Sequence, residues 1–179
     1  MVTIAEEIQQ WAGEVDRLDI SWLLQHVLNV NAAFLAAHPD YALTVEQAAY
    51  LHQLLTKRVA GMPVAYLTGK QGFYDSIFEV TPDVLIPRPE TELLVETALA
   101  RIPVNHACNI LDLGTGSGAI AITIARHRPH AQVLALDISS KALLLARKNA
   151  ERLSVRNIDF VMSNWYESLI SETKFDGIV

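Results

Sequence analysis

The residues best suited to chemistry lie in one stretch of the chain, residues 109–125. Asn109 to Leu113 is an apolar run that carries one acid, which predicts a buried strand. Ala119 to Arg126 is rich in good helix formers and predicts a helix. Three alternating glycines join the two elements: Gly114, Gly116 and Gly118. Such a turn leaves backbone N–H groups at a helix N-terminus and lets a ligand approach closely, so we expect a nucleotide-like cofactor here.

The charge before the glycines narrows the choice of cofactor. The spacing Gly114-x-Gly116-x-x-Ala119 also fits the dinucleotide fingerprint, which is a weak signal alone. Asp112, however, lies two residues before the first glycine. A carboxylate there would repel a pyrophosphate and suits a cationic ligand. S-adenosylmethionine carries an ammonium group and a sulfonium but no phosphate, so the sequence favours it over NAD.

Two later positions could complete a nucleoside site. A predicted strand over residues 132–137 ends in Asp137, about 20 residues beyond the glycines, where an acid can accept from both ribose hydroxyls. NAD enzymes and methyltransferases share this feature. After a third predicted strand, Asn164 could accept from an adenine amino group and Trp165 could pack on the adenine ring.

The N-terminal residues show only helical periodicity, up to about residue 60. One apolar face runs from Ile4 to Trp11, and a second runs from Leu18 to Leu28 with Asp19 or Ser21 near its start. A third short helix is expected over residues 31–37. Thr44 to Gln47 forms a capping box, which predicts a helix that continues to about Val59. This pattern fits a small helical bundle or a partner-recognition domain.

The middle of the chain changes character. Pro63 to Gly69 predicts a helical turn, and residues 71–80 predict a hairpin around Asp75-Ser76. Three prolines within residues 81–91 hold the backbone extended, as in a rigid linker or lid. Pro89 fits the first turn of a helix that ends before Pro103.

From residue 105 onward, strands alternate with helices, with strands expected over 109–113, 132–137, 157–161 and 175–179. The alternation predicts a parallel α/β sheet. We expect three parts: a helical N-terminal domain (1–70), a hairpin and Pro-rich linker (71–89), and the first part of a doubly wound domain (90–179). Four strands leave half of such a sheet unbuilt, so we expect a truncated chain.

Composition excludes several other classes. The 179 residues carry a net charge of −6, and residues 1–75 hold four Lys/Arg against eight Asp/Glu, so we expect no direct nucleic-acid binding. The single cysteine, Cys108, permits no internal disulfide. The six histidines lack metal-ligand spacing, so no metal is expected. No apolar run approaches the length of a membrane span, and no signal peptide is evident, which predicts a cytoplasmic protein without membrane contact.

Several motifs follow one another in the order of a known family. They are Pro63-x-x-Tyr-Leu-Thr-Gly69, Phe73-Tyr, Leu85-Ile-Pro-Arg-Pro-Glu-Thr-Glu92, Leu111-Asp-Leu-Gly-Thr-Gly-Ser-Gly118 and Ser163-Asn-Trp165. Together with the helical N-terminal part, they resemble the protein-(glutamine) methyltransferases of peptide chain release factors, the PrmC/HemK family. The resemblance covers essentially the whole chain, and its Ile-Pro-Arg-Pro-Glu-Thr segment is absent from generic methyltransferases.

The resemblance implies a Rossmann-like fold and transfer of a methyl group from S-adenosylmethionine to the side-chain amide nitrogen of the glutamine in a Gly-Gly-Gln motif. The acceptors would be class 1 release factors. The implied cofactor positions are Gly114, Thr115, Gly116, Ser117, Gly118, Asp137 and Trp165, with Asn164 and Asp112 as further candidates. Pro87 and Arg88 are implied to lie near the substrate. Asn164 departs from the acid that is common in the family.

The family's Asn-Pro-Pro-Tyr motif, whose Asn holds the substrate amide, should begin just beyond Val179. No catalytic residue is therefore expected within this chain, and we expect the chain alone to bind cofactor weakly or not at all and to lack turnover. Three alternatives are a methyltransferase with a nucleic-acid or small-molecule substrate, an NAD-dependent oxidoreductase, and a non-enzymatic binding module.

Overall fold

The computed structural model describes residues 2–170 and 173–179. The chain divides into two compact units, residues 1–69 and residues 70–179. The first unit contains only helices in its described residues, and the second contains a hairpin, a parallel sheet and three helices.

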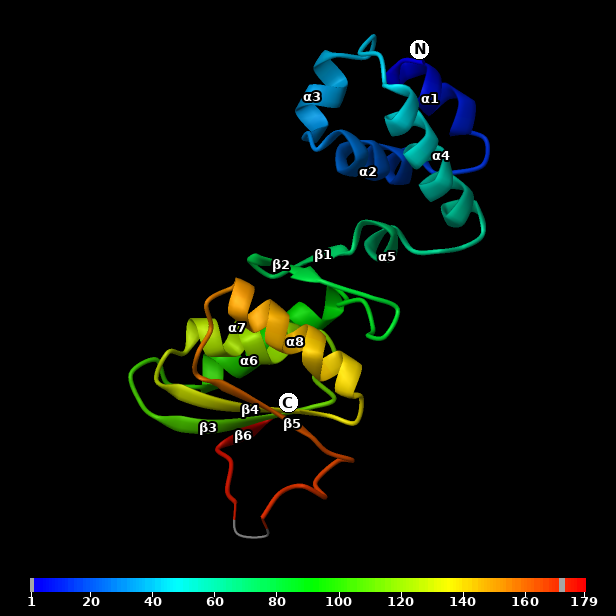
Figure 1. Ribbon diagram of the computed structural model, residues 1–179. Helices are drawn as coiled ribbons and strands as arrows, with labels where there is room; N and C mark the ends of the chain where they lie inside the picture. The colour runs from blue at the N-terminus through cyan, green and yellow to red at the C-terminus, as the bar shows by residue number, and fades with distance from the viewer. Residues whose placement is uncertain (1, 171–172) are drawn as a thin grey trace. The chain divides into compact units, whose positions relative to one another are not determined.

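The first unit contains five helices (Figure 1): α1 (Ile4–Trp11), α2 (Arg17–Leu28), α3 (Ala32–Ala37), α4 (Val45–Val59) and α5 (Val64–Thr68). The predicted capping box is confirmed, because Thr44 and Gln47 bond each other's backbone N–H groups at the start of α4. Helix α2 begins before Asp19, since Asp16 accepts from Leu18 N at 2.8 Å as its N-cap. Gly69 ends α5 in the left-handed region.

The core of the first unit contains one buried charge. Apolar side chains from α1, α2 and α4, such as Ile4, Leu23 and Leu55, are fully buried. Among them lies Glu7, with 0% of its surface exposed. His52 Nε2 on α4 lies 2.9 Å from both carboxylate oxygens of Glu7 and links the two helices.

The second unit begins with the predicted hairpin. Strands β1 (Lys70–Phe73) and β2 (Ser76–Glu79) pair in antiparallel fashion. The turn lies at Tyr74–Asp75, and Phe73 and Phe78 bury their rings edge to face, 6.1 Å apart. Residues 80–89 form no helix or strand, and α6 (Glu90–Arg101) starts directly after Pro89, as the proline predicts.

The sheet contains β3 (Cys108–Leu113), β4 (Ala131–Asp137), β5 (Ile158–Met162) and β6 (Gly177–Ile178), in the order β5-β4-β3-β6. All three pairings are parallel, as predicted. Strand β6 is shorter than the predicted 175–179, although Val179 still bonds Leu111 O and Leu113 N. The strand order reverses at β3, where α/β sheets bind ligands.

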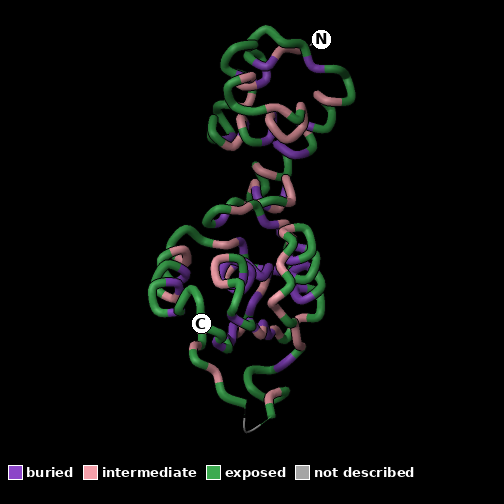
Figure 2. Tube along the Cα trace, turned by 90° about the vertical axis from the view of Figure 1, so that its left-hand side faces the viewer, coloured by how far each residue is buried: buried purple, intermediate pink, exposed green. Residues whose placement is uncertain are grey.

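Helices α7 (Ala119–His127) and α8 (Ser140–Arg152) complete the β-α-β units. Figure 1 shows them with α6 on one face of the sheet. The core lies between these helices and the sheet, where Figure 2 shows buried segments gathered. Cys108 is buried there, at the start of β3.

Candidate cofactor site at the carboxyl end of the sheet

The glycine turn connects β3 to α7, and the surroundings of its first and last glycines differ. All three have positive φ, which favours glycine. A Cβ at Gly114 would meet no atom within 4 Å, so this side of the turn is open. A Cβ at Gly118 would lie 2.6 Å from Ile122 Cδ1 and 3.2 Å from Ala146 Cβ. Gly118 therefore allows close packing of the turn against Ile122 of α7 and Ala146 of α8, whereas the sequence predicted an opening toward a ligand at all three positions.

The turn's backbone N–H groups are also less available than the sequence predicted. Gly114 and Thr115 both donate to Leu136 O, at 2.9 and 2.8 Å. Gly116 N donates to Asp137 Oδ2 at 2.8 Å, and Gly118 N donates to Thr115 O at 2.8 Å. These four N–H groups are engaged by the chain itself. The expected row of free donors is wrong for these groups, and a pyrophosphate would have to displace existing bonds.

A cavity of about 250 Å³ opens at the carboxyl ends of β3, β4 and β5. Its walls come from three loops, one after each strand, as expected at the point where strand order reverses. The lining residues are Leu113, Gly114, Leu136, Asp137, Ile138, Ser163, Asn164 and Trp165. The cavity thus brings together Gly114, Asp137, Asn164 and Trp165, four of the residues that the sequence singled out.

Asp137 holds the glycine turn in place. Its Oδ2 accepts from Gly116 N at 2.8 Å, and its Oδ1 accepts from Ser139 N at 2.9 Å. Each carboxylate oxygen has a second lone pair, so Asp137 can accept further hydrogen bonds while it holds both backbone groups. This capacity is what binding two ribose hydroxyls requires, and that role stays a prediction.

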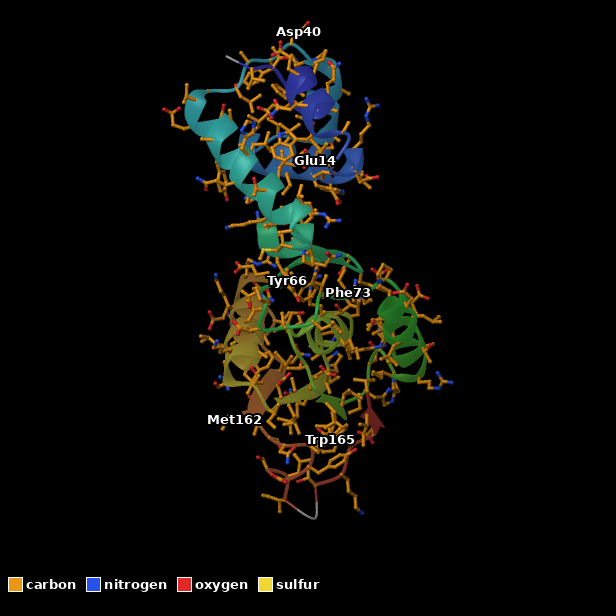
Figure 3. The ribbon with its side chains drawn as sticks, turned by 90° about the vertical axis from the view of Figure 1, so that its right-hand side faces the viewer. Glu14, Asp40, Tyr66, Phe73, Met162 and Trp165 are labelled. Carbon is orange, nitrogen blue, oxygen red and sulfur yellow. The ribbon has the colours of Figure 1, made fainter. Side chains whose placement is uncertain are left out.

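The loop after β5 forms the opposite wall. Trp165 is 70% exposed and has φ of 50°, and Figure 3 labels its ring in this loop. Ser163 Oγ donates to Trp165 O at 2.7 Å and accepts from Ser168 N at 3.1 Å, which fixes the loop. Asn164 Nδ2 donates to Glu167 Oε1 at 2.9 Å and so orients the amide. An exposed indole on a braced loop offers a flat surface for stacking.

Asp112 lies beneath the turn and does not line the cavity. It is 1% exposed, and burial raises its pKa to about 6, an effect opposed by the nearby Thr115 hydroxyl and the Ala121 backbone. Asp137 adds a smaller upward effect on this pKa. Among the described residues, Asp112 Oδ2 has no hydrogen-bond partner, and neither has Thr115 Oγ1. A buried carboxylate oxygen without a partner is costly and marks a candidate site.

The other predicted residues have different surroundings. Thr115 and Ser117 are 7% and 3% exposed, so their side chains support the turn from behind. Pro87 is half-buried and Arg88 is exposed, and neither lines the cavity. Leu113 and Leu136 also line it, as do Ile138, which sequence reasoning missed, and Ser163, which it named only as part of a motif. The positions of Ile138 and Ser163, directly after a strand-end acid and directly after β5, were the available signal.

Neither a metal-binding cluster nor a membrane-spanning helix is found among the described residues. Residues 2–170 and 173–179 contain no group of three or more His, Cys, Asp or Glu side chains able to hold a metal ion. In the same part of the chain, no helix has the length and apolar composition needed to cross a bilayer.

Comparisons with known families identify both units. A model of the PrmC N-terminal domain matches residues 5–69, and a model described as a methyltransferase domain matches residues 105–179. The second match includes the glycine turn and all of the cavity-lining residues.

Curated relatives match across both units. The release factor glutamine methyltransferase of Escherichia coli (strain K12) is 44% identical over 92% of this chain. That of Bordetella pertussis is 45% identical over 91% of this chain. The chain spans 59% and 60% of the length of these two relatives. A precorrin-6y C5,15-methyltransferase from Geobacter metallireducens aligns with 56% of this chain and 52% of its own, at 19% identity and a TM-score of 0.47. The chain is thus similar, over 91–92% of its length, to proteins named release factor glutamine methyltransferase, and its two matched segments resemble a PrmC N-terminal domain and a methyltransferase domain.

Proposed function

We propose that the cavity binds S-adenosylmethionine. This proposal rests on the hydrogen bonding of the polar groups in and beneath the glycine turn. Its N–H donors at Gly114, Thr115, Gly116 and Gly118 are already bonded, while the buried Asp112 keeps one oxygen without a partner among the described residues. Such a turn suits a cationic, phosphate-free ligand and disfavours the pyrophosphate of NAD.

The residues present fit this cofactor. Asp137 would hold the ribose hydroxyls, and Trp165 and Ile138 would cover the adenine, because both have exposed apolar surface beside the cavity. Asn164 would contact the adenine amino group. Gly114 and Gly116 give the methionine portion close access to the backbone, with Thr115, Ser117 and Gly118 holding the shape of the turn. Asp112 would act on the cationic end from below.

The substrate proposal rests on the relatives. Proteins named release factor glutamine methyltransferase share 44–45% of this chain's residues over the aligned length. We therefore propose that the protein methylates the side-chain amide nitrogen of the glutamine in the Gly-Gly-Gln motif of class 1 release factors. The PrmC N-terminal domain, with its excess of acidic residues, would recognise this protein substrate. We expect this to take place in the cytoplasm, without direct nucleic-acid binding.

Methyl transfer to an amide nitrogen makes particular demands on the protein. An amide nitrogen is a poor nucleophile because its lone pair is delocalised into the carbonyl group. When bound, S-adenosylmethionine would supply a methyl group on a sulfonium sulfur, which would leave as a neutral thioether, while the amide nitrogen would release one proton to solvent. The task left to the protein is to align the nitrogen with the methyl group and exclude water. The cavity residues orient the cofactor side of this geometry, and the Pro87–Arg88 segment is proposed to lie toward the substrate.

Methyl transfer tests this function directly. A protein in which this chain continues to the length of its relatives is incubated with labelled S-adenosylmethionine and a class 1 release factor. We expect label on the glutamine of the Gly-Gly-Gln motif and none when that glutamine is replaced by alanine. The 179-residue chain alone is expected to transfer no methyl group. Label on a nucleic acid or on other residues would contradict the proposed substrate.

A further inference from the structure

One buried amide connects the glycine turn to the hairpin. Asn149 on α8 is 0% exposed, and its carboxamide makes three hydrogen bonds. Its Oδ1 accepts from Glu79 N at 2.8 Å, and its Nδ2 donates to Glu79 O at 3.0 Å. The same Nδ2 donates to Ser117 O at 2.9 Å. Both amide hydrogens are used, and they reach segments that are far apart in sequence.

On the side of the glycine turn, Asn149 fixes one peptide plane. The carbonyl of Ser117 and the N–H of Gly118 belong to the same peptide unit. Asn149 holds the carbonyl end, while Thr115 O accepts from Gly118 N at 2.8 Å. Gly118 has φ of 82°, in the left-handed region, and α7 begins at the next residue. Rotation of this peptide would break both bonds and reshape the turn.

On the hairpin side, Asn149 imitates a neighbouring strand. It bonds both backbone groups of Glu79, the last residue of β2, as a strand partner would. The Glu79 side chain adds an ion pair to Lys148, 2.6 Å away on the same helix. The irregular segment 80–89, which contains Pro87 and Arg88, follows immediately. The end of the hairpin is thereby fastened to α8.

We propose that Asn149 is a positioning residue that holds the cofactor turn in its binding shape and couples that turn to the end of the hairpin. A shift of the hairpin moves the side-chain amide of Asn149, and this movement changes the orientation of the Ser117–Gly118 peptide. The reverse holds as well, because coupling between two sites is reciprocal. The coupling to the turn stands on the geometry alone, whereas its effect on the cofactor rests on the proposed function.

Asn157 provides a matched control. It is half-buried rather than fully buried, and its Nδ2 donates to Ala125 O, Arg128 O and Ala131 O at 2.9–3.1 Å. None of these acceptors belongs to the glycine turn or to Glu79, although the adjacent Arg126 and His127 pair with Asp75 at the hairpin turn. Asn149→Ala and Asn157→Ala each remove three hydrogen bonds from the same unit. Both are expected to lower overall stability, but only Asn149→Ala removes the link to Ser117.

The first measurement is amide hydrogen exchange by NMR on the 179-residue chain without ligand. We expect Asn149→Ala to speed exchange at Glu79 and Gly118 by about tenfold or more relative to the amides of β3 and β4, the effect of losing a local hydrogen bond. Asn157→Ala should change these two amides no more than the rest of the sheet. If Asn149→Ala fails to fold, Asn149→Ser, which keeps a small polar group, is compared with Asn157→Ser.

The second measurement is an NMR titration with S-adenosylhomocysteine, which reports weak binding. Asn149→Ala should raise the dissociation constant about tenfold and Asn157→Ala less than twofold. Unchanged exchange at Gly118 in the folded Asn149 variant, or equal effects of both variants on exchange and affinity, would overturn the proposal. If neither the unaltered chain nor a protein in which it continues to the length of its relatives binds S-adenosylhomocysteine, the cofactor proposal fails, and the exchange data alone decide whether Asn149 positions the turn.

Discussion

Among the residues that the structure describes, each unit buries one acidic side chain, and the two acids have different surroundings. Glu7 in the helical unit is 0% exposed, and both of its oxygens lie 2.9 Å from His52 Nε2. Asp112 in the sheet unit is 1% exposed, and its Oδ2 has no partner among the described residues. Both oxygens of Glu7 have a partner within its own unit, whereas one oxygen of Asp112 has none among the described residues and lies beneath the glycine turn.

The difference separates a structural role from a functional one. A buried acid with a good partner joins two helices and holds a core together. A buried acid without a full set of partners lowers stability, and proteins retain such groups where a ligand uses them. Asp112 raises the cost of folding at neutral pH because burial lifts its pKa to about 6. We therefore assign Glu7 to the architecture of the helical unit and propose Asp112 for the cofactor site.

The largest expected effect comes from leaving Glu7 without its partner. His52→Ala should lower the free energy of unfolding of residues 1–69 by about 3–5 kcal/mol, because the carboxylate remains buried without its histidine. Chemical denaturation followed by NMR signals from each unit measures this loss. Lys141→Ala, which breaks an ion pair with Asp83 whose side chains are 73% and 42% exposed, is the control and should cost less than about 1 kcal/mol. Equal losses would mean that burial of Glu7 adds nothing to the energy of its pair with His52.

The second prediction concerns pH. The pKa of Asp112 is about 6 in the folded protein, above its ordinary value of 3.8, so the folded state binds the proton more tightly. The contribution of Asp112 to stability should therefore fall as pH rises from about 4 to about 6, by up to about 3 kcal/mol. Asp112→Asn should remove this loss, making the protein more stable at pH 7 and its stability flatter across that range. A variant that is less stable at pH 7 would show that the carboxylate has an internal role after all.

The third prediction compares two glycines of the turn above Asp112. Gly118→Ala should cost about 2–4 kcal/mol, because it adds overlap with Ile122 and Ala146 to the strain of a positive φ. Gly114→Ala carries the strain alone, about 1–2 kcal/mol, since its Cβ would meet open space. Thermal unfolding of the two variants measures the difference. Similar losses would mean that the turn does not pack on α8 as described.

The smallest stability effect is expected at Trp165. Its side chain is mostly exposed, so Trp165→Ala should change the free energy of unfolding by less than about 0.5 kcal/mol. The same change should weaken binding of S-adenosylmethionine about tenfold, through loss of a stacking surface. Trp22→Ala, which removes a half-exposed tryptophan from the helical unit, should leave that affinity unchanged. Equal effects of both variants on affinity would remove Trp165 from the site.

Much of the fold follows from local patterns in the sequence. The capping box at Thr44, the proline before α6 and the apolar strands β3 to β5 all lie within one or two residues of their predicted places. These features depend on neighbours in the chain, so periodicity and capping chemistry reveal them. The position of Asp137 at the end of β4 follows for the same reason.

What the sequence does not reveal depends on contacts between distant segments. The bonds from Asn149 to Glu79 and Ser117 join residues 70 and 32 positions away. The packing of Gly118 on Ala146 and the pairing of Glu7 with His52 are of the same kind. No local pattern in the sequence marks such pairs. Gly118 was therefore predicted to make room for a ligand, whereas in the structure it makes room for close packing against a helix.

The central claim is that the glycine turn receives a phosphate-free, positively charged nucleoside. The most direct measurement is an NMR titration, at pH 7, of a protein in which this chain continues to the length of its relatives, with S-adenosylmethionine and, separately, with NAD. The account predicts that S-adenosylmethionine shifts the amide signals of Gly114, Asp137 and Trp165, while NAD at equal concentration leaves them in place. Tighter binding of NAD at this turn, or binding of S-adenosylmethionine that shifts only signals elsewhere, would contradict it.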